Sequence, residues 1–137
     1  MSVYDELSQT TIKNICEYVN GDTESSIFNY RTGSQLAEFF RHKFHVPDLV
    51  SGPSRWTLTE KTLQWLDACN DIDSFFSVLF SIRNMNHEHP DEDDTVCASL
   101  VERGIQDINN YLKVDDCEFK DNSANAGAAL FAQRGTL

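Results

Sequence analysis

The sequence predicts a mainly α-helical fold of about five helices with a small C-terminal β-hairpin. Apolar residues recur at helical spacing in five stretches, and turn-forming residues separate these stretches. Near the C-terminus, residues 117–120 alternate in polarity, and a turn-rich segment separates them from a second strand-like run at 128–133. With 137 residues and 40% hydrophobic side chains, the chain is long enough for one domain with its own core. We therefore expect residues 1–137 to form a single helical domain.

The first two helices are predicted at residues 8–19 and 33–44. The first has one apolar face and ends before Gly21, which suits the left-handed conformation common after a helix. The second carries phenylalanines on one face, a pattern typical of a core-facing helix. Between the two helices, residues 27–30 read as either a brief strand or a loop held by its aromatic side chains.

Three further helices are predicted at residues 57–69, from 72 to 82 or 83, and from 91 or 95 to 112. Thr57 and Glu60 have the spacing of a capping box, which places Trp56 just before the third helix. The fourth helix is rich in phenylalanine and should be central. An acidic polar connector follows it, and Pro90 suits the first turn of the fifth helix.

The charge balance argues against a surface that binds nucleic acid non-specifically. The chain has 22 acidic and 11 basic residues, for a net charge of −11, whereas such a surface needs clustered lysine and arginine. One local basic spot is still expected, and it comprises Arg31, Arg41, His42, Lys43 and His45. We therefore regard nucleic acid as an unlikely partner.

No cofactor or metal is expected from the sequence. The cysteines at positions 16, 69, 97 and 117 are single and fall at apolar positions, so we interpret them as core residues. His42 and His45 have a spacing that can hold a metal ion, but cations near a helix C-terminus are the simpler interpretation. The chain shows neither a signal peptide nor an apolar run of membrane-spanning length. These features predict a cytoplasmic protein with reduced thiols and no membrane contact.

The most specific local pattern is Arg83-Asn84 followed by His87 and His89. It resembles the R-N-x4–6-H signature of HEPN ribonucleases, helical bundles in which Arg and His meet at the end of a helix and cleave RNA as a dimer. Histidine can transfer the proton and arginine can stabilise the charged phosphorane. The alternative is structural, because asparagine caps helices well and arginine neutralises terminal carbonyls. The acids that follow His89 would also repel RNA.

Taken together, residues 53–119 resemble the helical N-terminal domain of AbiJ-like abortive-infection proteins, which act in bacterial anti-phage defence. The matching segments are Ser54-Arg55-Trp56, Thr59-Glu60-Lys61-Thr62-Leu63, Ser81-Ile82-Arg83-Asn84-Met85, and the closing run from Ile108 to Phe119. The closing run departs from the family pattern at Asp116-Cys117, where the family has Gly-Tyr.

The resemblance implies a non-catalytic sensor or adaptor domain that contacts a protein partner or an effector domain. These residues are then either the N-terminal part of a longer protein or a free-standing version. Arg55 and Trp56 should organise the fold, with Arg55 bonding loop carbonyls or a carboxylate such as Asp115, and a ligand pocket near Trp56 is a further option. Two alternatives stay open. One is a HEPN-like ribonuclease using Arg83, His87 and His89, and the other is an acidic inhibitor that mimics nucleic acid.

Overall fold

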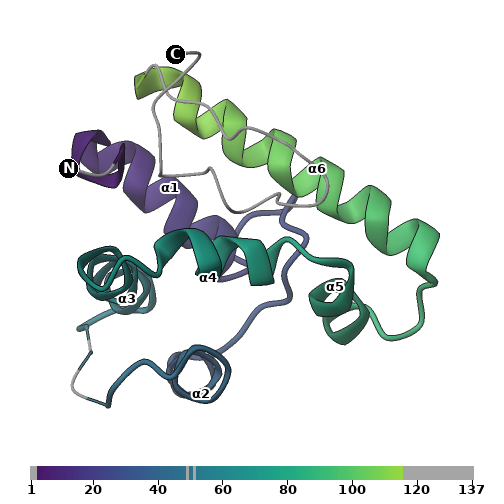
Figure 1. The fold of residues 1–137 in the computed structure, drawn as a ribbon, viewed down its shortest axis with the longest axis horizontal. Coiled ribbons are helices and arrows are strands. Elements are labelled where there is room, and N and C mark those ends of the chain that lie inside the picture. The colour runs from purple at the N-terminus through teal and green to yellow at the C-terminus, as the bar shows by residue number, and fades with distance from the viewer. Residues whose placement is uncertain (1–2, 49, 51, 116–137) are drawn as a thin grey trace.

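The computed structural model describes residues 3–48, 50 and 52–115, and these residues form a set of packed helices (Figure 1). In chain order the elements are η1 (Val3–Glu6), α1 (Gln9–Val19), α2 (Gly33–Phe44), α3 (Arg55–Ala68), α4 (Ile72–Leu79), α5 (Ile82–Glu88), α6 (Asp94–Leu112) and η2 (Lys113–Asp115), where η marks a 3-10 helix.

The prediction of a mainly helical fold is confirmed. No strand occurs in the described part of the chain, and residues 27–30 form a loop rather than a brief strand. The predicted C-terminal hairpin, at 117–120 and 128–133, lies outside the described residues. None of the helices in the described ranges combines the length and the apolar character needed to cross a membrane.

The prediction of one helix from residue 72 to 82 or 83 is wrong. Two helices, α4 and α5, occupy this range, and α5 continues into the predicted connector. The backbone leaves the helical conformation at Phe80, with φ −95° and ψ 56°. Ser81 then caps α5, since its hydroxyl accepts from Asn84 N–H at 3.1 Å and donates to the Val78 carbonyl at 2.7 Å. The Arg83-Asn84 pair therefore opens a helix instead of ending one.

The start of α3 also differs from the prediction. Ser54 is the N-cap, and its side chain and that of Thr57 form a reciprocal capping box. Trp56 consequently lies in the first turn of α3, not before it. Thr57 has a helix-starting role, but it acts three residues into the helix rather than as the cap.

The connector before α6 is longer than the prediction from Pro90 suggests. Pro90 lies in a turn, and Asp93 caps α6 by accepting a hydrogen bond from Val96 N–H at 2.9 Å. An aspartate at this position also interacts favourably with the positive end of the helix dipole.

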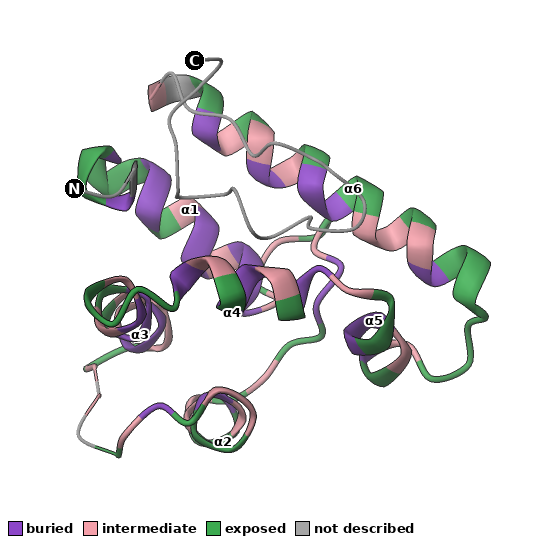
Figure 2. Ribbon diagram, viewed as in Figure 1, coloured by how far each residue is buried: buried purple, intermediate pink, exposed green. Residues whose placement is uncertain are grey.

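A continuous series of aromatic contacts runs through the core from α2 to α6. It links Phe44 to Phe75 and Phe76 in α4, then to Phe80, Phe28, Tyr18 and Tyr111, with centroid separations from 4.5 to 6.1 Å. Each helix turns its buried stripe toward this centre, as the purple segments of Figure 2 show. The loop between α1 and α2 is thus part of the core, because Ile27 and Phe28 are both buried.

The cysteines follow the core prediction in two of three described positions. Cys16 and Cys97 are buried, as predicted, whereas Cys69 is exposed at the end of α3. Cys69 follows the last helical residue, so the apolar spacing that predicted its burial no longer applies there. Cys117 lies outside the described residues.

Candidate interaction site

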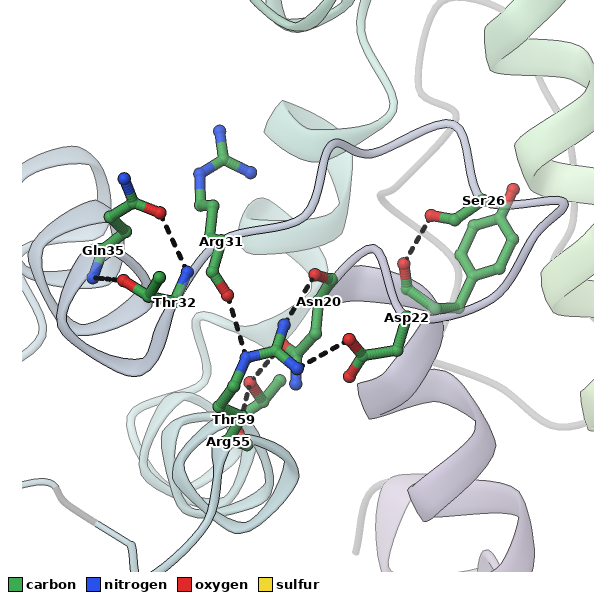
Figure 3. A network of polar contacts seen from close by, with 9 residues as sticks. Asn20, Asp22, Ser26, Arg31, Thr32, Gln35, Arg55 and Thr59 are labelled. Carbon is green, nitrogen blue, oxygen red and sulfur yellow. Dashed lines mark hydrogen bonds and ion pairs between the residues drawn. The ribbon is translucent and has the colours of Figure 1, made fainter.

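Arg55 is the centre of a polar network that joins α3 to the loop between α1 and α2 (Figure 3). Its guanidinium donates to the carbonyl oxygens of Arg31 and Asn20, at 2.8 and 3.1 Å, and to the carboxylate of Asp22 at 2.6 Å. The same guanidinium lies 4.2 Å from the ring centroid of Tyr30. A planar cation with several donors suits this arrangement of fixed acceptors.

This network agrees with one part of the prediction for Arg55 and corrects the other. Arg55 does bond loop carbonyls and a carboxylate, but that carboxylate is Asp22 rather than Asp115. The Asp115 carboxylate instead accepts from the backbone N–H of Ser8 at 2.9 Å, which ties η2 to the start of α1. Asp22 lies 33 residues before Arg55 and outside the segments that carry the resemblance.

Trp56 has a smaller role in the structure than Arg55. It is half-buried and packs against the edge of the core. The Nζ atom of Lys13 lies 5.4 Å from the centroid of its ring system, so a cation–π contact links α3 to α1. The ring therefore joins two helices at the margin of the core.

The end of α5 holds the same loop from its other side. Glu88 is buried, and its carboxylate accepts from Asn29 N–H at 2.8 Å and forms an ion pair with Arg31. The Nε2 atom of His89 lies 2.7 Å from the Ile27 carbonyl oxygen. His89 is thus engaged in a structural contact with the loop.

Arg83 and His87, two other members of the nuclease pattern, take no part in the contact between His89 and Ile27. Both are exposed and are one helical turn apart on α5. Asn84, between them in sequence, is buried and donates to the Leu79 carbonyl at 3.1 Å. Asn84 therefore supports the α4–α5 corner, and only Arg83 and His87 remain available to another molecule.

The basic spot predicted around α2 divides into separate groups. Arg31 and Lys43 both lie over the ring of Phe39, at 4.0 and 6.0 Å from its centroid. Arg41 instead pairs with Asp48 at 2.9 Å. His42 lies 3.8 Å from Glu38, and His45 ends α2 in the left-handed conformation, with φ 58°.

A cavity of about 560 Å³ lies between α2 and α3. Phe40, Val46 and Leu58 give it apolar walls, and Arg41 and Arg55 lie at its margin. Both arginines already have carboxylate partners. Trp56 is not among its lining residues, although the neighbouring Arg55 is, and the pocket near Trp56 stays a prediction.

No group of three or more potential metal ligands occurs in the ranges that the structure describes. Asp91, Glu92, Asp93 and Asp94 are all exposed. Asp93 caps α6, and Asp94 accepts a hydrogen bond from Asn86 at 3.2 Å. Two of the four acids thus have local structural contacts.

Comparison with models of known families, with curated proteins and with solved structures yields no match for this chain. The resemblance to AbiJ-like domains therefore stays a prediction.

Sequence reasoning missed Glu88, the most deeply buried acid in the described part of the chain. It was grouped with a solvated acidic connector because acids follow it closely. The signal that could have found it is helical spacing: Glu88 follows buried Met85 by three residues and Asn84 by four, which places all three on one face.

Proposed function

We propose that this chain is a non-catalytic protein-interaction domain that acts as a sensor or adaptor in bacterial anti-phage defence. The observation that carries the non-catalytic part is the contact between His89 Nε2 and the Ile27 carbonyl at 2.7 Å. A histidine held in this way positions a loop, whereas Arg83 is exposed. The defence setting, with its fused or partnered effector, rests on the resemblance of residues 53–119 to AbiJ-like domains.

The polar groups near the predicted motif support the same proposal. Arg55, Arg31 and Glu88 all have their charges compensated inside the fold. Catalysis of phosphoryl transfer requires charged groups directed at a reacting phosphate, not consumed by structural partners. A domain that uses its charged residues in this way is suited to presenting a stable surface.

A HEPN-like ribonuclease is the second candidate, and one observation favours it. Arg83 and His87 are exposed one turn apart on α5, an arrangement in which the arginine can contact a phosphate and the histidine can transfer a proton. The two candidates differ in whether His87 must exchange a proton.

Incubation with labelled single-stranded RNA separates the two candidates. We expect wild-type protein and the His87→Ala and His89→Gln variants to leave the RNA equally intact. In a host carrying the complete natural protein, His87→Ala should protect against phage as well as wild type does. Cleavage by wild type that is lost in His87→Ala would overturn the proposal in favour of the ribonuclease.

A further inference from the structure

We propose that the cationic patch formed by Arg31, Phe39, Lys43 and Arg83 binds an acidic segment of a partner protein. This inference rests on the interaction function proposed above and gives the partner its chemistry. The patch lies where α2, α5 and the loop between α1 and α2 come together.

The aromatic ring of Phe39 gives the patch a fixed floor. The guanidinium of Arg31 lies 4.0 Å from the ring centroid, and Lys43 Nζ lies 6.0 Å from the same centroid. Phe39 in turn contacts Phe40 and Phe44 at 5.7 and 5.6 Å, so the ring is anchored to the core. Two cations therefore contact one aromatic ring that is anchored to the core.

The buried carboxylate beneath the patch is already occupied. Glu88 Oε1 accepts from Asn29 N–H, and Glu88 Oε2 pairs with Arg31. Within residues 3–48, 50 and 52–115, neither Lys43 nor Arg83 has a carboxylate at ion-pair distance. Arg31 neutralises the Glu88 carboxylate, so the unpaired charges of Lys43 and Arg83 leave a local excess of positive charge in a strongly acidic protein.

The electrostatics of Lys43 are consistent with this excess. Partial burial lowers the pKa of its ammonium group, Glu88 opposes that change, and the nearby charges of Arg83 and Arg31 lower it further. A cation in such surroundings gains more from an added anion than a fully hydrated lysine does. An incoming carboxylate would relieve the repulsion among the three cations.

A surface hollow of about 330 Å³ adjoins the patch and provides room for a side chain. Its lining includes Phe39 and Lys43 together with Gln35, Glu38 and His42. The Glu38 carboxylate in this lining lies 3.8 Å from His42 Nε2. A glutamate side chain has the size and charge to enter beside Lys43.

The extent of the patch favours an acidic protein segment over a nucleic acid. A nucleic-acid strand carries a charge on every nucleotide and needs a basic surface that continues along its backbone. Beyond these three cations such a strand would meet a chain with 22 acidic residues, including the exposed run at 91–94. A short acidic segment confines its charge to the patch.

Fluorescence anisotropy with labelled hexaglutamate tests the proposal at low ionic strength. We expect saturable binding that weakens with added salt and becomes at least about tenfold weaker in the Lys43→Glu/Arg83→Glu variant. The matched control is Lys61→Glu/Arg103→Glu, which makes the same change in net charge at exposed positions elsewhere and should change affinity far less. Circular dichroism checks that both variants are folded. If Lys43→Glu/Arg83→Glu is unfolded, Lys43→Ala/Arg83→Ala takes its place in the binding assay.

Three results would overturn the proposal. They are a lack of saturable hexaglutamate binding, an equal loss in the control variant, and tighter binding of a labelled oligouridylate through the same residues. None of them depends on RNA cleavage, so failure of the acidic-segment proposal is distinguishable from failure of the interaction function.

Discussion

Arg55, in α3, connects that helix to both ends of the loop between α1 and α2. Its acceptors, on Asn20, Asp22 and Arg31, come from either end of the loop between α1 and α2. Removal of the guanidinium would leave two carbonyls without their donor and one carboxylate without its counter-charge. Hydrogen bonds that involve a charged group contribute more to stability than neutral ones do.

We therefore predict that Arg55→Ala lowers the free energy of unfolding by about 2–3 kcal/mol. Urea unfolding followed by circular dichroism measures this change. Arg103→Ala is the matched control, because Arg103 is exposed and donates one bond, to the Ser25 carbonyl at 3.1 Å. Its cost should stay below about 1 kcal/mol. Equal effects of the two substitutions would show that the Arg55 network contributes no more to the free energy of unfolding than a single exposed hydrogen bond does.

At the scale of elements, the close approach of α6 to the loop depends on Gly104. A Cβ atom at this position would lie 2.5 Å from Ile27 Cδ1 and 2.9 Å from Phe80 Cε1. Both neighbours are buried and have little room to move. The glycine thus lets the middle of α6 pack directly onto the aromatic core.

Gly104→Ala should destabilise the protein even though alanine is the better helix former. The gain in helix propensity is about 1 kcal/mol, whereas overpacking costs about 1–3 kcal/mol, so we expect a net loss of about 1 kcal/mol. Thermal unfolding should show a lower midpoint for this variant. Ser99→Ala, at an exposed position of the same helix, should raise the midpoint slightly or leave it unchanged. A stabilised Gly104→Ala protein would contradict the close packing described.

The elements also show which features a sequence can predict. Helical spacing located α1, α2 and α6 closely, because each of these helices has one continuous apolar face. The break between α4 and α5 was missed because Phe80 and Ile82 continue the apolar pattern across it. A serine in such a run can be either helical or a cap, and only the hydrogen bond from Asn84 N–H distinguishes the two.

The partners of Arg55 and Glu88 could not be predicted for a different reason. They lie 24 to 59 residues away along the chain. Local patterns carry no information on such pairs. The role of Arg55 in bonding loop carbonyls was predicted from a motif, whereas the identity of those carbonyls required the fold.

At the scale of the whole molecule, tyrosines that are buried or partly buried make the free energy of unfolding depend on pH in the alkaline range. Burial raises the pKa of Tyr4, Tyr18 and Tyr111 above the ordinary value of 10.0, and the hydrogen bond from Tyr18 to Asp107, at 2.7 Å, adds to this effect. A phenol with a higher pKa in the folded state than in the unfolded state resists ionisation only while folded. Its contribution is complete below pH 10 and is lost as the pH rises from 10 toward the folded-state pKa.

We therefore predict that the free energy of unfolding falls progressively above about pH 10. Urea unfolding at several pH values between 8 and 11 measures the slope. Tyr18→Phe should be about 1 kcal/mol less stable at pH 8, because it loses the bond to Asp107, but its stability should fall less steeply above pH 10. An unchanged slope in Tyr18→Phe would exclude that residue as a source of the alkaline effect.

The loop between α1 and α2 takes much of its shape from side chains that belong to other elements. Arg55 in α3, and Glu88 and His89 at the end of α5, bond its backbone groups rather than its side chains for most of these contacts. Exposed positions in this loop are consequently free to change during evolution without loss of form, except those whose side chains join these contacts, such as Asp22 and Asn29. Selection would act most strongly on the three distant residues, which a comparison of future homologues can reveal as a fixed set around a variable segment.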